Sequence, residues 1–63
     1  MDLTEGMWVA VIFNGGQRAV GHVREEYNTL YINCITEDNA VTTIRGEDVE
    51  NWCEIQVNWE AAE

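Results

Sequence analysis

The sequence predicts a small all-β protein, a strongly bent five-stranded antiparallel barrel, from three observations. Apolar and polar residues alternate with a period of two, which is typical of strands and is most regular over residues 53–60. Glycine, asparagine and aspartate interrupt the alternation at short intervals, as tight turns between short strands do. Gly21 lies inside an otherwise strand-like segment, where a glycine indicates a bend or the close approach of another backbone. A bent strand is how so short a sheet closes on itself.

The predicted elements follow this punctuation. Five strands are expected, at residues 7–13, 17–25, 30–35, 40–44 and from about 49 or 51 to 59. The first is apolar on both faces, so it is expected to be central or covered on both sides. Asn14-Gly15-Gly16 suits the positive φ of a primed hairpin turn. Residues 25–29 and 36–39 are expected to form the next two turns, and residues 45–48 one turn of 3₁₀ helix.

The two cysteines are expected to be buried, reduced thiols, because both lie in apolar segments. Cys34 alternates in phase with Ile32, on the face of the third strand that is expected to point inward. Cys53 alternates in phase with Ile55 and Trp59. A disulfide between the two cysteines stays open if their strands are neighbours.

No catalytic or metal site is expected. His22 and the two cysteines lack the C-x-x-C spacing of a zinc site and have no obvious fourth ligand. The acidic pairs Glu25-Glu26 and Glu47-Asp48 fall at predicted turns, where carboxylates are solvated rather than placed in a cleft that would shift their pKa. The sequence therefore predicts a protein that is not an enzyme and carries no cofactor.

The charge is strongly negative. Twelve aspartates and glutamates stand against three arginines, with a net charge of −9 over 63 residues. Such a chain repels nucleic acid at long range, and its charge suits solubility, a basic protein partner or a locally basic spot on an acidic body. It has no apolar run long enough to span a membrane, and residues 1–6 contain no basic residue or apolar core. We expect a single domain over residues 1–63, in the cytoplasm and without membrane contact.

Self-assembly is expected from two features. Trp8, Trp52 and Trp59 are many large rings for a chain of this size, and rings that the barrel cannot hold would leave an apolar patch. The fourth predicted strand, residues 40–44, contains no charge and no proline that would block pairing at a sheet edge. A head-to-tail contact between such edges closes into a ring.

Two patterns in the chain resemble the two motifs of the Sm and LSm family, over about residues 9–49. The first has alternating apolar residues, a glycine turn, a second glycine five positions later and an apolar strand. The second is an apolar residue, Arg-Gly, two polar positions and an aliphatic residue. The matching residues are Val9, Val11, Phe13, Gly16, Gly21, Leu30 and Ile32 for the first, and Ile44-Arg45-Gly46-Glu47-Asp48-Val49 for the second. Other SH3-like barrels, Tudor-like or KOW-like, stay open as alternatives.

The resemblance implies an SH3-like barrel of the Sm-like type, a ring of about five to seven subunits, and binding or processing of single-stranded RNA near a pore lined by Arg45. The family's uridine-binding Asp and Asn positions are occupied here by Tyr27 and Tyr31. We therefore expect stacking of bases on Tyr27 or Tyr31, beside Asn28 in the same turn, and phosphate contact at Arg45-Gly46.

A rival interpretation is an acidic protein-interaction module that docks on a basic partner, as a phage-encoded mimic of nucleic acid would. The charge and the missing Asp and Asn favour this rival. The Arg45-Gly46 motif favours the RNA-binding ring.

Overall fold

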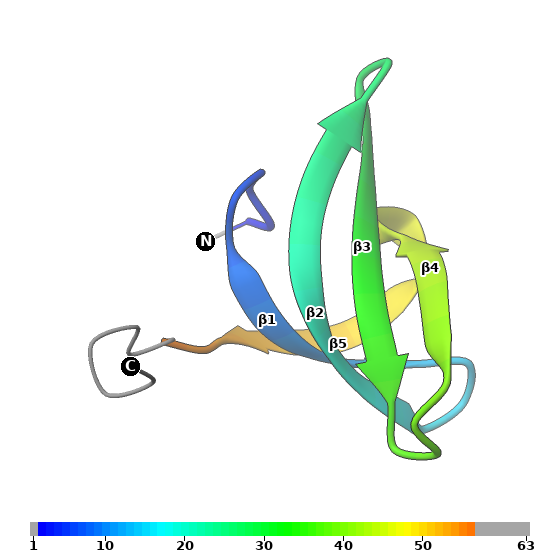
Figure 1. Cartoon of the computed structure of the whole chain (residues 1–63). Helices are drawn as coiled ribbons and strands as arrows, with labels where there is room; N and C mark the ends of the chain where they lie inside the picture. Colours follow the sequence, from blue (N-terminus) through cyan, green and yellow to red (C-terminus); the bar gives the residue numbers. More distant parts are fainter. Residues whose placement is uncertain (1, 57–63) are drawn as a thin grey trace.

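A computed structural model of the protein describes residues 2–56, which form five strands and one 3₁₀ turn (Figure 1). The elements are β1 (Trp8–Phe13), β2 (Gln17–Glu26), β3 (Thr29–Thr36), β4 (Val41–Arg45), η1 (Gly46–Asp48) and β5 (Val49–Glu54). All paired strands are antiparallel. The predicted all-β, five-stranded antiparallel structure is confirmed, as is the 3₁₀ turn between the last two strands. Across residues 2–56, no helix has the length and apolar character needed to cross a membrane.

The strands form one sheet in the order β4-β3-β2-β1-β5. β1 to β4 make a meander, and β5 returns to pair with the free side of β1, so β1 is an inner strand of the sheet, as predicted. β2 and β3 curve together along their length (Figure 1). Within residues 2–56, β4 and β5 do not pair with each other, so each is an edge of the sheet.

Gly21 lies on β2 directly opposite Cys34 of β3. A Cβ atom at this position would stand 2.3 Å from the carbonyl oxygen of Asn33 and 2.6 Å from the Cβ atom of Cys34. No side chain fits there without moving the backbone of β3. The close approach expected at this glycine is therefore confirmed.

One face of the sheet forms the core, and we call it the inner face. Its buried residues alternate along β1, β2 and β3, as a period of two requires. They are Val9, Val11, Phe13, Ala19, Val23, Ile32 and Cys34. Leu3, Met7, Leu30, Ile44, Val49 and Trp52 are partly buried and pack against them. The alternate strand positions, such as Ala10, Val20 and Ile35, point to the opposite, outer face.

A β-bulge in β5 decides which of its residues face the core. Consecutive residues of β1 pair with Asn51 and Val49, so Glu50 has no Cα partner. One extra residue exchanges the faces of everything that follows it. Val49 and Trp52 therefore both turn toward the core, whereas Cys53 is exposed. The prediction of a buried Cys53 is wrong for this reason.

The two cysteines are both free thiols. Cys34 is buried on β3, as predicted. β3 and β5 are separated by β2 and β1 in the sheet, so a disulfide between Cys34 and Cys53 does not form. β5 ends at Glu54, short of the predicted end at Trp59. The predicted strand positions Val57 and Trp59 lie outside the described residues.

Glu50, the bulged residue, ties the first turn to β5. The backbone N–H of Gly15 donates a hydrogen bond of 2.6 Å to Oε2 of Glu50. The turn has positive φ at Asn14, Gly15 and Gly16, and Gly16 N–H donates to the Phe13 carbonyl at 3.1 Å. The predicted hairpin turn is confirmed.

Candidate functional site

Three of the five residues singled out in the sequence line one cleft. Asn28, Arg45 and Gly46 border it, although the turn that holds Asn28 and the β4–η1 junction that holds Arg45 are far apart in the chain. Tyr31 lies beside this cleft, because its Cα partner on β4 is Arg45. Tyr27 stands apart at the tip of the turn, where 99% of its surface is exposed.

The turn that carries Tyr27 and Asn28 contains only these two residues, since Glu26 pairs with Thr29. Tyr27 has a φ of 51° and Asn28 a φ of 63°. Positive φ at both central residues is the signature of a type I′ hairpin turn, which matches the twist of the flanking strands. Asparagine adopts this conformation readily, whereas it is uncommon for tyrosine.

Gly46 permits η1 to pack closely against β3. A Cβ atom at Gly46 would stand 3.2 Å from the Cβ atom of Leu30 and 3.7 Å from Cδ1 of Leu3. The glycine of the Arg-Gly motif therefore has a packing role. The arginine of the motif is free to project outward, with 61% of its side chain exposed.

The cleft contains charges of both signs. Arg45 is its cation, and its Nη1 lies 3.4 Å from Oε1 of Glu47. Asp2 and Glu47 also line the cleft. A phosphate group in this cleft would meet one arginine and two carboxylates, so the cleft by itself has little attraction for an anion.

Sequence reasoning missed Arg24. It lies on β2 opposite Tyr31, and its guanidinium carbon stands 5.5 Å from the centre of the Tyr31 ring, a cation–π geometry. Arg24, Tyr31 and Arg45 therefore form one row across three strands on the outer face. The exact position of the second turn would have predicted this row, because a two-residue turn at 27–28 places residue 24 opposite residue 31.

The ion pairs of Arg24 are local. It pairs with Glu26 on its own strand, and its Nε donates a hydrogen bond of 3.3 Å to Oδ1 of Asn33. The same oxygen accepts a 3.0 Å hydrogen bond from the hydroxyl of Thr43. Asn33 thus connects the row of Arg24 and Tyr31 to the next row of the outer face.

That next row contains Trp8, His22, Asn33 and Thr43, which are aligned across β1 to β4. The rings of Trp8 and His22 are in contact, with centroids 4.7 Å apart and planes inclined at 45°. Trp8 and His22 are both half-buried. Among residues 2–56 no group of three or more His, Cys, Asp or Glu side chains could hold a metal ion.

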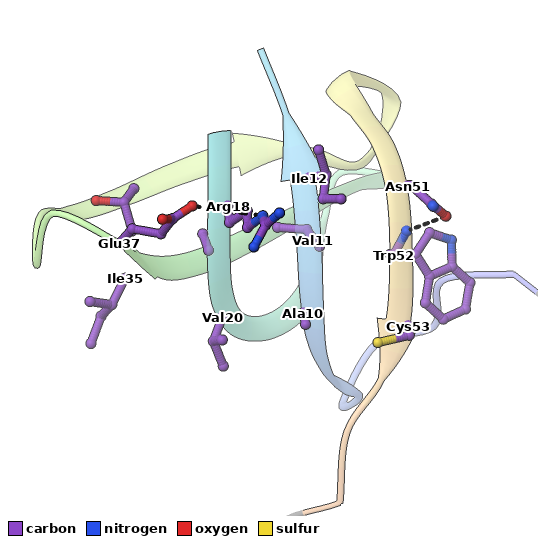
Figure 2. Close-up of a pocket in the computed structure, with 12 residues that line it drawn as sticks. Ala10, Val11, Ile12, Arg18, Val20, Ile35, Glu37, Asn51, Trp52 and Cys53 are labelled. Carbon is purple, nitrogen blue, oxygen red and sulfur yellow. Dashed lines mark hydrogen bonds and ion pairs between the residues drawn. The ribbon is translucent and has the colours of Figure 1, made fainter. Parts of the chain in front are cut away.

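An apolar groove lies further along the outer face. Ala10, Val20 and Ile35 are aligned across β1, β2 and β3, and their side chains point to the same side (Figure 2). The groove also includes Cys53, the Cα partner of Ala10, and it ends near the exposed ion pair between Arg18 and Glu37. Val20 and Ile35 are 49% and 52% exposed, so this apolar surface is open to solvent.

Fold and site together define a small five-stranded antiparallel sheet protein with arginine and tyrosine aligned on its outer face. A comparison with protein families finds no match, and a comparison with curated proteins finds no significant match. The resemblance to Sm and LSm proteins therefore rests on the two sequence patterns in residues 9–49 alone.

Proposed function

We propose that the protein is a non-catalytic, Sm-like subunit that assembles into a ring and binds single-stranded RNA. The observation that supports binding is the position of Arg45 beside Tyr31, next to the cleft that Asn28 and Gly46 line. An aromatic ring offers a face on which any base can stack, and a neighbouring arginine can contact the adjoining phosphate.

The sheet order supports an SH3-like barrel of the Sm-like type and its assembly. β4 and β5 are the two edges, and η1 connects them. β4 carries no charge before Arg45, and Val41 at its start is 81% exposed. Pairing β4 of one copy with β5 of the next would satisfy both edges head to tail, and such a contact closes into a ring.

The acidic chain sets a condition on this function. At a net charge of −9, long-range repulsion opposes the approach of RNA. Binding must therefore depend on short-range stacking and on arginines that a ring repeats around its axis. Added salt screens the long-range repulsion, which raises the affinity for RNA, and it weakens the arginine–phosphate contacts, which lowers the affinity. The change of affinity with salt therefore shows whether the repulsion or the phosphate contacts contribute more.

The test is a fluorescence anisotropy titration with labelled oligo-uridine and mixed-sequence single strands of about twelve nucleotides. We expect binding at low salt, and Arg45→Gln weakens it about tenfold, as loss of a charge-assisted hydrogen bond does. Arg18→Gln is the matched control, because Arg18 lies on the same face near the apolar groove. No binding at low salt, or equal loss in both variants, would refute RNA binding at this site.

Light scattering after size exclusion tests the ring separately. We expect a mass of about five to seven chains. Replacing Thr43 with proline removes a backbone N–H from β4 and should yield smaller species. A wild-type monomer would refute the ring.

A second candidate function is docking on a basic protein, and one observation favours it. Asp2 and Glu47 stand beside Arg45 in the cleft, in a chain with four times as many acidic as basic residues. A titration with an arginine-rich peptide separates the two functions. Tight binding of the peptide, together with no binding of single strands, would favour docking.

A further inference from the structure

We infer that single-stranded nucleic acid lies across the outer face of β1 to β4, on a platform formed by Trp8, His22, Arg24, Tyr31 and Arg45. This inference rests on the proposed RNA binding and specifies its surface. The nucleic acid would lie over the sheet and would also contact the cleft that Asn28, Arg45 and Gly46 line. We call these five residues the outer platform.

The register of the sheet places the outer platform in two neighbouring rows. Arg24, Tyr31 and Arg45 are consecutive Cα partners across β2, β3 and β4. Trp8 and His22 are partners in the next row, two residues further along the strands. Successive rows on one face of a sheet are about 7 Å apart. Side chains from both rows can therefore contact one short stretch of nucleic acid.

The outer platform offers aromatic faces that the sheet holds in place. Tyr31 lies beneath the guanidinium of Arg24, and the Trp8 ring contacts the His22 ring. All three rings are half-buried, so each is fixed on one side and accessible on part of its surface. Unstacked bases pack on such rings, as they do on other sheet surfaces that bind single strands.

The outer face carries a larger share of the basic residues than the rest of the chain. All three arginines, Arg18, Arg24 and Arg45, occupy outer positions of the paired strands. Glu26 is the one carboxylate at the outer paired positions of the described sheet. Glu37 and Glu47 lie beyond these paired positions and form ion pairs with Arg18 and Arg45. The outer face is therefore less acidic than the chain as a whole, and it repels an anionic strand less.

The arginines can exchange their present partners for phosphate. Arg24 pairs with Glu26, and Arg45 with Glu47, and all four side chains are 37% to 72% exposed. Exposed ion pairs contribute at most about 1 kcal/mol, so exchanging them costs little. Asn33 and Thr43, in the same row as Trp8 and His22, add exposed polar groups that can meet base edges or sugars.

Single strands fit this surface better than a duplex. In a double helix the base faces are stacked inside and cannot reach Tyr31 or His22. The surface also differs from the apolar groove along the same strands, where the aliphatic side chains of Ala10, Val20 and Ile35 lie in place of the rings of Trp8, His22 and Tyr31. The accessible rings and arginines of the outer platform therefore favour single-stranded over double-stranded nucleic acid.

The experiment compares Arg24→Gln, Tyr31→Leu and His22→Ala with Arg18→Gln, by anisotropy with a single-stranded oligonucleotide of about twelve nucleotides. Arg24→Gln should weaken binding about tenfold and reduce the slope of log K against log salt by about 0.7. Tyr31→Leu and His22→Ala should each weaken binding by tenfold or more, as loss of a stacked base does. Arg18→Gln should change affinity less than about twofold.

The outcomes separate this inference from the proposed function. If wild type binds and Arg45→Gln weakens binding, but Arg24→Gln and His22→Ala do not, the outer platform is wrong and RNA binding at the cleft stands. If wild type binds no single strand, both fail. Amide chemical shifts of wild type during the titration give a measurement independent of variant folding. Shifts at residues 8, 22, 24 and 31 support the outer platform, and shifts confined to 28 and 45–47 overturn it.

Discussion

The inner and outer faces of the sheet are built from alternate residues of the same strands, yet they differ in burial. On β3, Ile32 is fully buried on the inner face, whereas Ile35 is 52% exposed on the outer face. On β2, Val23 and Val20 differ in the same way, at 0% and 49% exposed. The comparison teaches that a chain of this size has one small core and leaves much of its second face exposed to solvent, where the proposed binding would take place. Stability should therefore depend on the inner face and affinity on the outer face.

The largest expected effect comes from filling the space at Gly21. Gly21→Ala places a Cβ atom against the backbone of β3, so we expect a loss of more than about 4 kcal/mol in the free energy of unfolding. So large a loss would leave a small domain unfolded. Circular dichroism with urea denaturation measures it.

Gly16→Ala is the control for this prediction. Nothing lies within 4 Å of a Cβ atom at Gly16, but its φ of 125° is unfavourable for alanine. We expect a loss of about 1–2 kcal/mol there. If the two alanine variants were equally stable, the close approach of β2 and β3 at Gly21 would be wrong.

The next largest effect is the difference in stability between the same substitution on the two faces of β3. Ile32→Ala removes a fully buried side chain and should lower the free energy of unfolding by about 2–5 kcal/mol. Ile35→Ala, on the outer face, should change it by about 0.5 kcal/mol. Urea denaturation of both variants gives the difference directly. Equal losses would contradict the assignment of the two faces.

A smaller effect should appear at alkaline pH. Burial raises the pKa of the Cys34 thiol above its ordinary value of 9.0. As the pH rises, the unfolded chain loses this proton first, so stability is complete below about pH 9 and falls as the pH rises through the folded-state pKa. Cys34→Ala should reduce this alkaline loss in urea denaturation at about pH 7 and about pH 10.

Thiol labelling is the control for that measurement. In the native state a thiol reagent should modify exposed Cys53 quickly and buried Cys34 slowly. Rapid labelling of both would show that Cys34 is not buried, and an unchanged pH profile in Cys34→Ala would show that its thiol is not the cause.

The smallest expected effect is at the far end of the outer face. The ion pair between Arg18 and Glu37 is 3.9 Å long, and both side chains are more than half exposed. Arg18→Gln should therefore change the free energy of unfolding by less than about 0.5 kcal/mol. A thermal melt at two salt concentrations checks this. A larger loss would show that the outer face also contributes to stability, and would remove this variant as a control.

Much of the fold was predictable because its determinants are local. Asn14, Gly15 and Gly16 supply the positive φ that the first turn needs, and alternation along β3 identifies its inner residues. The outward position of Cys53 was not predictable in this way. It depends on the bulge at Glu50, which exists only in the pairing with β1.

The candidate site was predictable only in part. Arg45 and Gly46 stand out in the sequence through their motif, and the structure brings them to the cleft with Asn28. The position of Arg24 beside Tyr31 depended on the length of the second turn. A turn expected over 25–29 leaves several registers possible, whereas the two-residue turn leaves one.

The sequence by itself determined the strands, the turns and the charge of this protein, because each depends on neighbouring residues or on composition alone. The tertiary structure decided which residues meet: Arg24, Tyr31 and Arg45 in one row, and Cys53 outside the core. The physical reason is that register and bulges are set when strands pair. A shift of one residue moves every following side chain to the other face of the sheet.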